Sequence, residues 1–285
     1  MTAILDSTRA ELLRLRKWPA VWITVGAWVA LALTFGYVFD YVSYVTGTES
    51  FATEGTSGAA ARDALLSGLL PQGVPDVLVQ GMPMFGGALA MVLGALVAGN
   101  GFGWGTWKTA FTQGPSRIAV VGGSLAALSA FVVLIVAVTL ALFAAVSSGI
   151  ALAEGEAIVW PAVGDLAQAV GGGLLVLEMW ALLGYAAGII ARGPALAVGL
   201  GLVWALVVEN LLRGVGSLLD VVERLTHFLP GTAAGSLVGS LTGAGSGTPG
   251  VLDVIPGDQA LLTVAVYVVG LTAVVLTVMR RRDLA

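Results

Sequence analysis

Six long apolar runs constrain the fold of this chain more than any other feature. They lie at about residues 20–39, 77–98, 118–146, 166–190, 195–212 and 259–279. Each is close to the roughly 20 residues that a helix needs to cross a bilayer, and the third is long enough to tilt or to extend beyond it. The sequence therefore predicts an all-α polytopic membrane protein with six transmembrane helices, forming a single transmembrane domain over residues 1–285.

The composition supports this class and excludes several kinds of site. Of the 285 residues, 58% are hydrophobic and only 11% are charged, a balance that water-soluble domains do not have. The chain contains no cysteine and one histidine, His227, so cysteine nucleophiles, disulfides and multi-histidine metal motifs are excluded. We expect no metal site. The glycine triplet at 171–173, within the fourth run, is interpreted as a surface for close helix packing.

The N-terminal segment, residues 1–18, mixes basic residues with leucines. This pattern predicts an amphipathic helix that lies on the membrane surface before the first span. The segment and the run after it superficially resemble a signal peptide. The apolar run continues well past the small-residue site at 30–32, however, so we predict that the helix is retained.

The distribution of basic residues predicts the orientation of the chain. Ten of the 13 lysines and arginines lie in the N-terminal segment, the 99–117 loop, the 191–194 turn and the C-terminal tail. They are Arg9, Arg14, Arg16, Lys17, Lys108, Arg117, Arg192, Arg280, Arg281 and Arg282. Most acidic residues fall in the other loops. Because short loops rich in lysine and arginine stay in the cytoplasm, we expect a multi-pass protein of the cell (plasma) membrane with both termini cytoplasmic.

The 99–117 loop is a polar, glycine-broken segment between the second and third runs. Its first three glycines are expected to release the preceding helix, because glycine tolerates unusual backbone angles. These are Gly101, Gly103 and Gly105. Thr106 then begins a short helix, which Gly114-Pro115 ends, and Ser116 is placed to cap the next helix. A short surface helix of this kind can serve as a simple anchor or as a contact for a partner.

Two carboxylates interrupt the apolar runs. Glu178 lies near the middle of the fourth run, and Glu209 lies in the outer half of the fifth, beside Asn210. An unpaired charge at the centre of a span costs roughly 2.5–3.5 kcal/mol on insertion scales. Either these side chains face a cavity and meet a cationic or hydrogen-bonding substrate, or each is protonated or bonded to a neighbouring group such as Trp180, Tyr185, Trp204 or Asn210.

The order of motifs along the chain resembles that of a known family. A basic N-terminal helix precedes the six runs. The 99–117 loop contains a Gly-Thr-Trp-Lys string followed by a Gly-Pro-Ser-Arg string, and Phe-Leu-Pro stands at 228–230, before the last run. This pattern resembles the membrane (permease) subunit of a type-2 ATP-binding cassette (ABC) exporter over essentially the whole length. Many members carry an acidic residue where this chain has Gly101 and a lysine where it has Ser124.

The resemblance implies both partners and site residues. In that family the 99–117 loop holds a cytoplasmic coupling helix that docks on a separate ATPase subunit, and the last outer loop, here 213–258, contains short re-entrant helices. The implied coupling residues are Gly105, Thr106, Trp107, Lys108, Phe111 and Arg117. The resemblance also implies two copies of this chain with two ATPase subunits, which hold ATP and Mg, and a substrate path between the membrane halves.

No Gly-x-x-x-x-Gly-Lys-Ser/Thr motif occurs, so this chain is not expected to be an enzyme or to bind a cofactor itself. The leading hypothesis is an exporter subunit for an amphiphilic substrate such as an antibiotic, a peptide or a lipid, with Glu178, Glu209 and Asn210 along its path. The alternatives are an ion-coupled secondary transporter in which Glu178 carries a proton, and an intramembrane protease with paired glutamates. Membrane lipid is an expected partner; nucleic acid is not.

Overall fold

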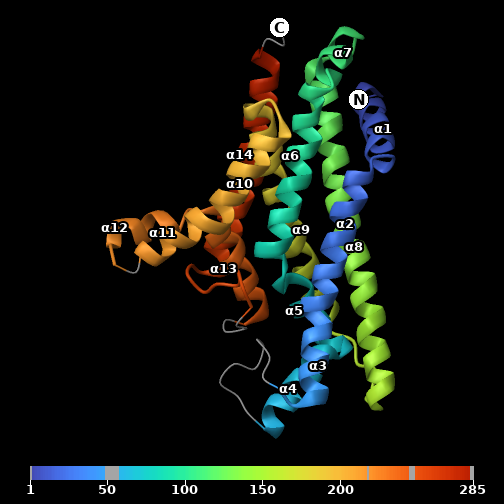
Figure 1. The fold of residues 1–285 in the computed structure, drawn as a ribbon, viewed down its shortest axis with the longest axis vertical. Helices are drawn as coiled ribbons and strands as arrows, with labels where there is room; N and C mark the ends of the chain where they lie inside the picture. The colour runs from blue at the N-terminus through green and yellow to red at the C-terminus, as the bar shows by residue number, and fades with distance from the viewer. Residues whose placement is uncertain (1, 49–57, 217, 244–247, 283–285) are drawn as a thin grey trace.

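The structure, a computed structural model, describes residues 2–48, 58–216, 218–243 and 248–282. The described residues are 85% helical and contain no strand. Figure 1 shows an elongated bundle with the N-terminal helix α1 (Thr2–Arg16), helix α7 (Thr106–Thr112) and the C-terminus at one end. Helices α3 (Phe39–Thr46) and α4 (Ala59–Leu69) lie at the other end.

Six helical segments are long and apolar enough to cross a membrane, as predicted. They are Pro19–Thr46, Met82–Gly103, Arg117–Glu154, Val163–Ala191, Pro194–Gly216 and Gly257–Arg281. Each predicted run falls largely within one of these segments, so the chain fits a polytopic membrane protein. Of the other elements, α1 is a helix as predicted.

The first span continues beyond its predicted end. It consists of α2 (Pro19–Leu33), a π-helical turn η1 (Thr34–Val38) and α3, so residues 40–46, which were expected to form a loop, are helical. Tyr41 and Tyr44 explain the extension, because both hydroxyls donate to Glu154 at the end of the third span, over 3.2 and 3.0 Å. The chain then returns through α4, a short 3₁₀ turn and α5 (Val74–Gln80).

The remaining spans follow in order. The second is η4 (Met82–Gly86) with α6 (Gly87–Gly103), the third is α8 (Arg117–Glu154), and the fourth is α9 (Val163–Ala191). The fifth is α10 (Pro194–Val203), η5 (Trp204–Val208) and α11 (Glu209–Gly216). Two short helices, α12 (Asp220–Thr226) and α13 (Pro230–Thr242), precede the last span, α14 (Gly257–Arg281).

Helices α6 and α9 form the centre of the bundle through direct backbone contact. A Cβ atom on Gly94 would lie 1.9 Å from the carbonyl oxygen of Ala181, and one on Gly184 would lie 1.9 Å from that of Met91. Only glycine permits this approach. The predicted packing role of the 171–173 glycines is confirmed for two of them, since a Cβ on Gly172 or Gly173 would also clash, whereas Gly171 faces open space.

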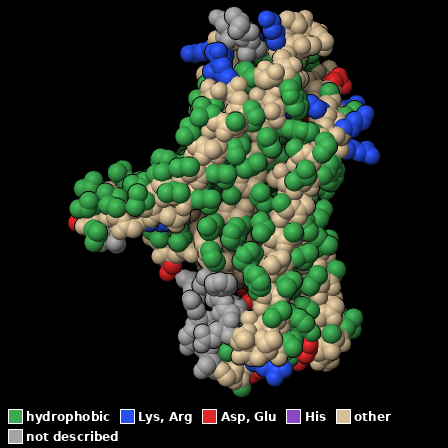
Figure 2. Space-filling view, in the orientation of Figure 1, with side chains coloured by type: hydrophobic (Ala, Val, Ile, Leu, Met, Phe, Trp, Pro, Cys, Tyr) green, Lys and Arg blue, Asp and Glu red, His purple; other side chains and the backbone are tan. Residues whose placement is uncertain are grey.

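The first half of the fifth span, α10, packs along the bundle, whereas α11 and α12 project sideways from it (Figure 1). The surface of this projection is strongly apolar (Figure 2), and exposed side chains on and beside it include Leu211, Leu218, Val221 and Phe228. Helices α12 and α13 lie where the sequence suggested short helices in the last loop.

Candidate coupling site

The segment around α7 lies at the end of the bundle that carries both termini (Figure 1). Lysine and arginine side chains gather at the same end (Figure 2). The segments that were grouped by charge in the sequence therefore do lie together in space. Which side of a membrane this end faces remains a prediction.

Two residues, Trp104 and Gly105, separate α6 from α7, so the break contains one glycine rather than three. The expectation that the helix is released at Gly101 is wrong, because α6 continues through Gly103. Gly105 makes the break with a left-handed backbone, φ +67°. Gly101 has a different role: a Cβ there would lie 2.2 Å from Nε1 of Trp107, so this glycine provides the space that the indole ring occupies.

Trp107 attaches α7 to the second span. Its ring is only 5% exposed, and its indole N–H donates to the carbonyl of Ala98 over 3.0 Å. The side chain therefore packs mainly against the second span, with one part bordering the space between α7 and α1. The surface that α7 offers consists of the exposed residues Lys108, Thr109 and Thr112.

The other end of α7 is tied to the third span. The helix ends at Thr112, and the Ser116 hydroxyl caps α8 by accepting from the amide of Ala119 over 3.2 Å, as the sequence predicted. The Arg117 guanidinium lies 5.4 Å from the centre of the Phe111 ring. Both ends of α7 are thus joined to membrane-spanning helices by short, defined contacts.

Arg282 forms a connection that sequence reasoning missed, since the arginines at 280–282 were interpreted only as a topology signal. Its guanidinium donates to the carbonyls of Ile189 and Ile190 and lies 5.9 Å from the Phe102 ring. Its own carbonyl accepts from Arg117. A cation at the carbonyl end of α9 is electrostatically favourable. Arg282 therefore links the second, third, fourth and sixth spans at this end.

A groove separates α7 from α1. Its empty volume is about 1190 Å³, of which about 520 Å³ admits the centre of a water molecule. Its walls carry mostly small side chains, among them Ala3, Ser7 and Ala10 on α1 and Thr106 and Ala110 on the α7 side. A groove of this width and lining can receive part of a partner protein.

The floor of the groove is a small buried polar cluster. Glu11 pairs with Arg14 and accepts from the Ser124 hydroxyl over 3.2 Å, and Arg14 donates to the carbonyl of Val97 over 3.3 Å. Burial raises the pKa of Glu11, while Arg14 and Ser124 oppose that rise. Ser124, which stands where the resemblance would place a lysine, thus serves as a neutral partner for Glu11. Gly123 allows α1 to contact α8, since its Cβ would lie 2.5 Å from Cβ of Ser7.

The two carboxylates of the membrane-spanning runs have different surroundings. Glu178 is half-buried and accepts from the Ser129 hydroxyl on α8 over 2.6 Å, a partner that the sequence did not suggest. Among the described residues, its carboxylate and that of Glu209 have different hydrogen-bond partners, on different helices, so these two residues do not form the paired arrangement that a protease would need.

Glu209 is fully buried and engaged within the chain. Its carboxylate accepts from the Trp204 indole over 3.1 Å, as suggested from the sequence, and from the backbone amide of Gly231 over 2.8 Å. It also lies 3.9 Å from Arg213. The exposed Asn210 accepts from the same arginine over 2.8 Å. Glu209 therefore joins the fifth span to the start of α13, which weakens its assignment to a substrate path.

Comparison with protein-family models and with curated proteins finds no match for this chain. Within the described ranges, no group of three or more acidic, histidine or cysteine side chains could hold a metal ion. The site is therefore interpreted from its geometry and from the resemblance described above.

Proposed function

We propose that this chain is the membrane-spanning subunit of an ATP-driven exporter and that α7 couples it to a separate ATPase subunit. One observation carries this proposal: a short helix with an exposed polar face is held at the end of the bundle between two membrane spans. Trp107 fixes one end of α7 to α6, and the contact of Phe111 with Arg117 fixes the other to α8.

This attachment gives α7 a mechanical role. A membrane subunit responds to ATP only if the ATPase binds two of its arrangements with different affinity. Because both ends of α7 are fastened to spans, a displacement of α7 by the partner moves the second and third spans with it. The contacts of Arg282 extend the same connection to the fourth and sixth spans.

The groove between α1 and α7 is the proposed docking surface for the ATPase subunit. Its small side chains leave room for a partner helix, and the Lys108 ammonium stands exposed on the neighbouring face of α7. The ATP and Mg would be held by that partner.

The apolar outer surfaces of the fifth and sixth spans fit contact with lipid and with a second copy of this chain. The proposed substrate is amphiphilic, such as an antibiotic, a peptide or a lipid, and it crosses between the two copies. Of the three candidate path residues, Glu178 fits best, because its carboxylate is half-buried in a span and has one hydroxyl partner. Glu209 and Asn210 are engaged with Arg213 instead.

The decisive experiment is co-purification followed by an ATPase assay. The chain, tagged and purified from its native membrane, should bring with it a subunit that carries a nucleotide-binding motif, and ATP hydrolysis by that subunit should depend on this chain. Lys108→Glu should reduce both, whereas the matched Lys17→Glu, also exposed but not on α7, should not. Co-purification that is equal for both variants would contradict the role of α7.

A secondary transporter is the second candidate, favoured by the isolated pair of Glu178 with Ser129 within the spans. In that case a proton gradient would drive transport without ATP. Glu178→Gln would abolish the gradient-driven transport, whereas an ATP-driven exporter with the same substitution would still respond to its ATPase subunit.

A further inference from the structure

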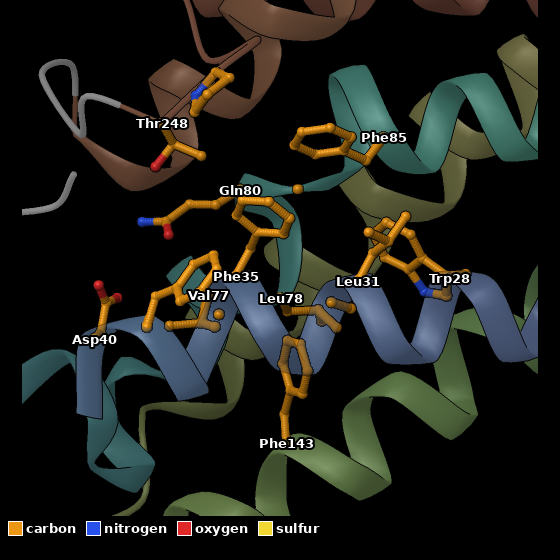
Figure 3. A pocket seen from close by; sticks show the side chains of 15 residues that line it. Trp28, Leu31, Phe35, Asp40, Val77, Leu78, Gln80, Phe85, Phe143 and Thr248 are labelled. Carbon is orange, nitrogen blue, oxygen red and sulfur yellow. The ribbon is translucent and has the colours of Figure 1, made fainter. Parts of the chain in front are cut away.

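A second groove lies near the opposite end of the bundle from α7, within a single copy of the chain (Figure 3). The first span forms one wall, and α5 with η4 forms the other. Phe143 of α8 and Thr248 lie on opposite sides of it (Figure 3), and Pro249 is a further lining residue. This groove shares no residue with the coupling site or with the candidate substrate path.

The lining changes character along its length. Trp28, Phe35 and Phe85 make most of the wall aromatic, and the rings of Phe35 and Phe85 stack with centroids 5.1 Å apart. The polar side chains of Asp40 and Gln80 gather at one end (Figure 3). The side-chain amide of Gln80 forms no hydrogen bond within the described part of the chain. The groove therefore has an apolar body and a polar, acidic mouth.

The backbone is irregular where the groove forms. Two π-helical turns, η1 in the first span and η4 in the second, contribute lining residues from opposite walls. Such turns are frequent at functional sites. Gly81, just before η4, borders the same space: a Cβ there would make ordinary van der Waals contact with the Trp28 ring at 3.5 Å, so a larger side chain would extend into the groove.

The dimensions of the groove select the shape of its occupant. Its cavity volume is only about 60 Å³, so the groove is narrow. Along the first span it extends from Trp28 to Asp40, which is about 18 Å of helix at 1.5 Å per residue. A narrow apolar channel of this length suits a single alkyl chain better than a bulky ring system.

We propose that this groove binds a single-chain cationic amphiphile. The alkyl chain lies against Phe35, Phe85 and Trp28, and the ammonium head donates hydrogen bonds to Asp40 and Gln80 at the mouth. The negative charge of Asp40 selects a cation over an anion of equal chain length. The site needs neither a second copy of the chain nor an ATPase subunit, so it is independent of the proposed function and can be tested separately.

The test uses two photoreactive probes in nanodiscs that contain the purified chain without any partner. One is a diazirine-tagged dodecylamine, and the other is the dodecanoic acid with the same tag. The amine should label the peptides around Phe35 and Phe85 saturably, and unlabelled dodecylamine should compete. Equal labelling of these peptides by the two probes, or stronger labelling by the acid, would overturn the proposal.

Two pairs of variants make the test specific. Asp40→Asn should weaken binding of the amine about tenfold, as expected for one lost charge-assisted hydrogen bond, whereas Asp63→Asn, exposed at the same end and outside the groove, should not. Gly81→Leu should block the channel, whereas Gly26→Leu on the first span meets open space. The proposal would be overturned if Asp40→Asn and Asp63→Asn, or Gly81→Leu and Gly26→Leu, were labelled to the same extent. If Gly81→Leu does not fold, the isosteric Asp40→Asn still tests the proposal.

Discussion

The second and fourth spans differ sharply from the fifth and sixth, although all four are similarly apolar. In the most apolar stretches of α6 and α9, 67% and 61% of residues are buried, compared with 11% in the fifth span and 11% in α14. Apolar composition therefore does not decide which span is central. Glycines do, because Gly94 and Gly184 let two backbones touch where larger residues would separate them.

The two regions also differ in the contacts that hold their helices in place. Backbone contact and interlocked side chains hold the central pair. The fifth span is attached to the rest of the molecule partly through a polar cluster around the buried carboxylate of Glu209. We expect the central pair to behave as one rigid unit and the peripheral spans to adjust more easily to lipid or to another copy.

The strongest test of this contrast is the same substitution in both regions. Gly94→Leu forces its side chain against the Ala181 carbonyl and should remove most folded protein, since neither backbone can yield. Gly199→Leu, on the fifth span, meets open space and should leave the melting temperature in detergent nearly unchanged. Size-exclusion profiles and thermal unfolding measure both. Equal losses would show that the peripheral spans are packed as tightly as the centre.

The second test concerns α7, which extends from the central pair. Trp107→Ala removes a buried indole and its hydrogen bond to Ala98, so it should destabilise the docking of α7 by about 3 kcal/mol. Hydrogen exchange of the α7 amides should rise steeply while the exchange of α9 stays slow. Trp104→Ala is the control, because that ring is 59% exposed. If both variants exchange alike, Trp107 does not hold α7.

Local signals in the sequence were enough to predict much of this arrangement. Six runs of suitable length predicted the spans, the Gly-Pro pair predicted the end of α7, and Ser116 predicted its cap on α8. Each of these features depends on neighbouring residues. The turn at 191–194 belongs here too, since α9 ends at Ala191 and α10 begins at Pro194.

Features that depend on distant partners were not predicted. The helical extension at 40–46 relies on Glu154, more than 100 residues away, and the role of Arg282 relies on carbonyls at the end of α9. Gly101 was expected to release a helix, but it makes room for Trp107 instead. In an apolar chain any glycine can serve either purpose, and only the neighbour that approaches it decides which.

The third test weakens the polar attachment of the fifth span. Glu209→Gln keeps an acceptor for Trp204 and Gly231 but removes the charge that faces Arg213, so it should cost about 1 kcal/mol. A double-mutant cycle with Arg213→Gln, measured by thermal unfolding, isolates the pair. A coupling energy near zero would mean that apolar packing alone holds the fifth span in place.

The smallest expected effect lies at the outer end of the central pair, where Asp76 precedes the second span and faces Asp165 at the start of α9. Burial, and then the charge of Asp165, raises the pKa of Asp76 in the folded protein. The folded state therefore holds this proton more tightly than the unfolded state, so the contribution of Asp76 to stability is greatest at low pH and is lost as pH rises from the ordinary value of 3.8 through the raised pKa. Asp76→Asn removes this penalty and should raise the melting temperature slightly at neutral pH but not at acidic pH. A rise in melting temperature that persists at acidic pH would point to a change in packing rather than to relief of charge repulsion. The central pair would then be less tightly packed at this end than its glycine contacts imply.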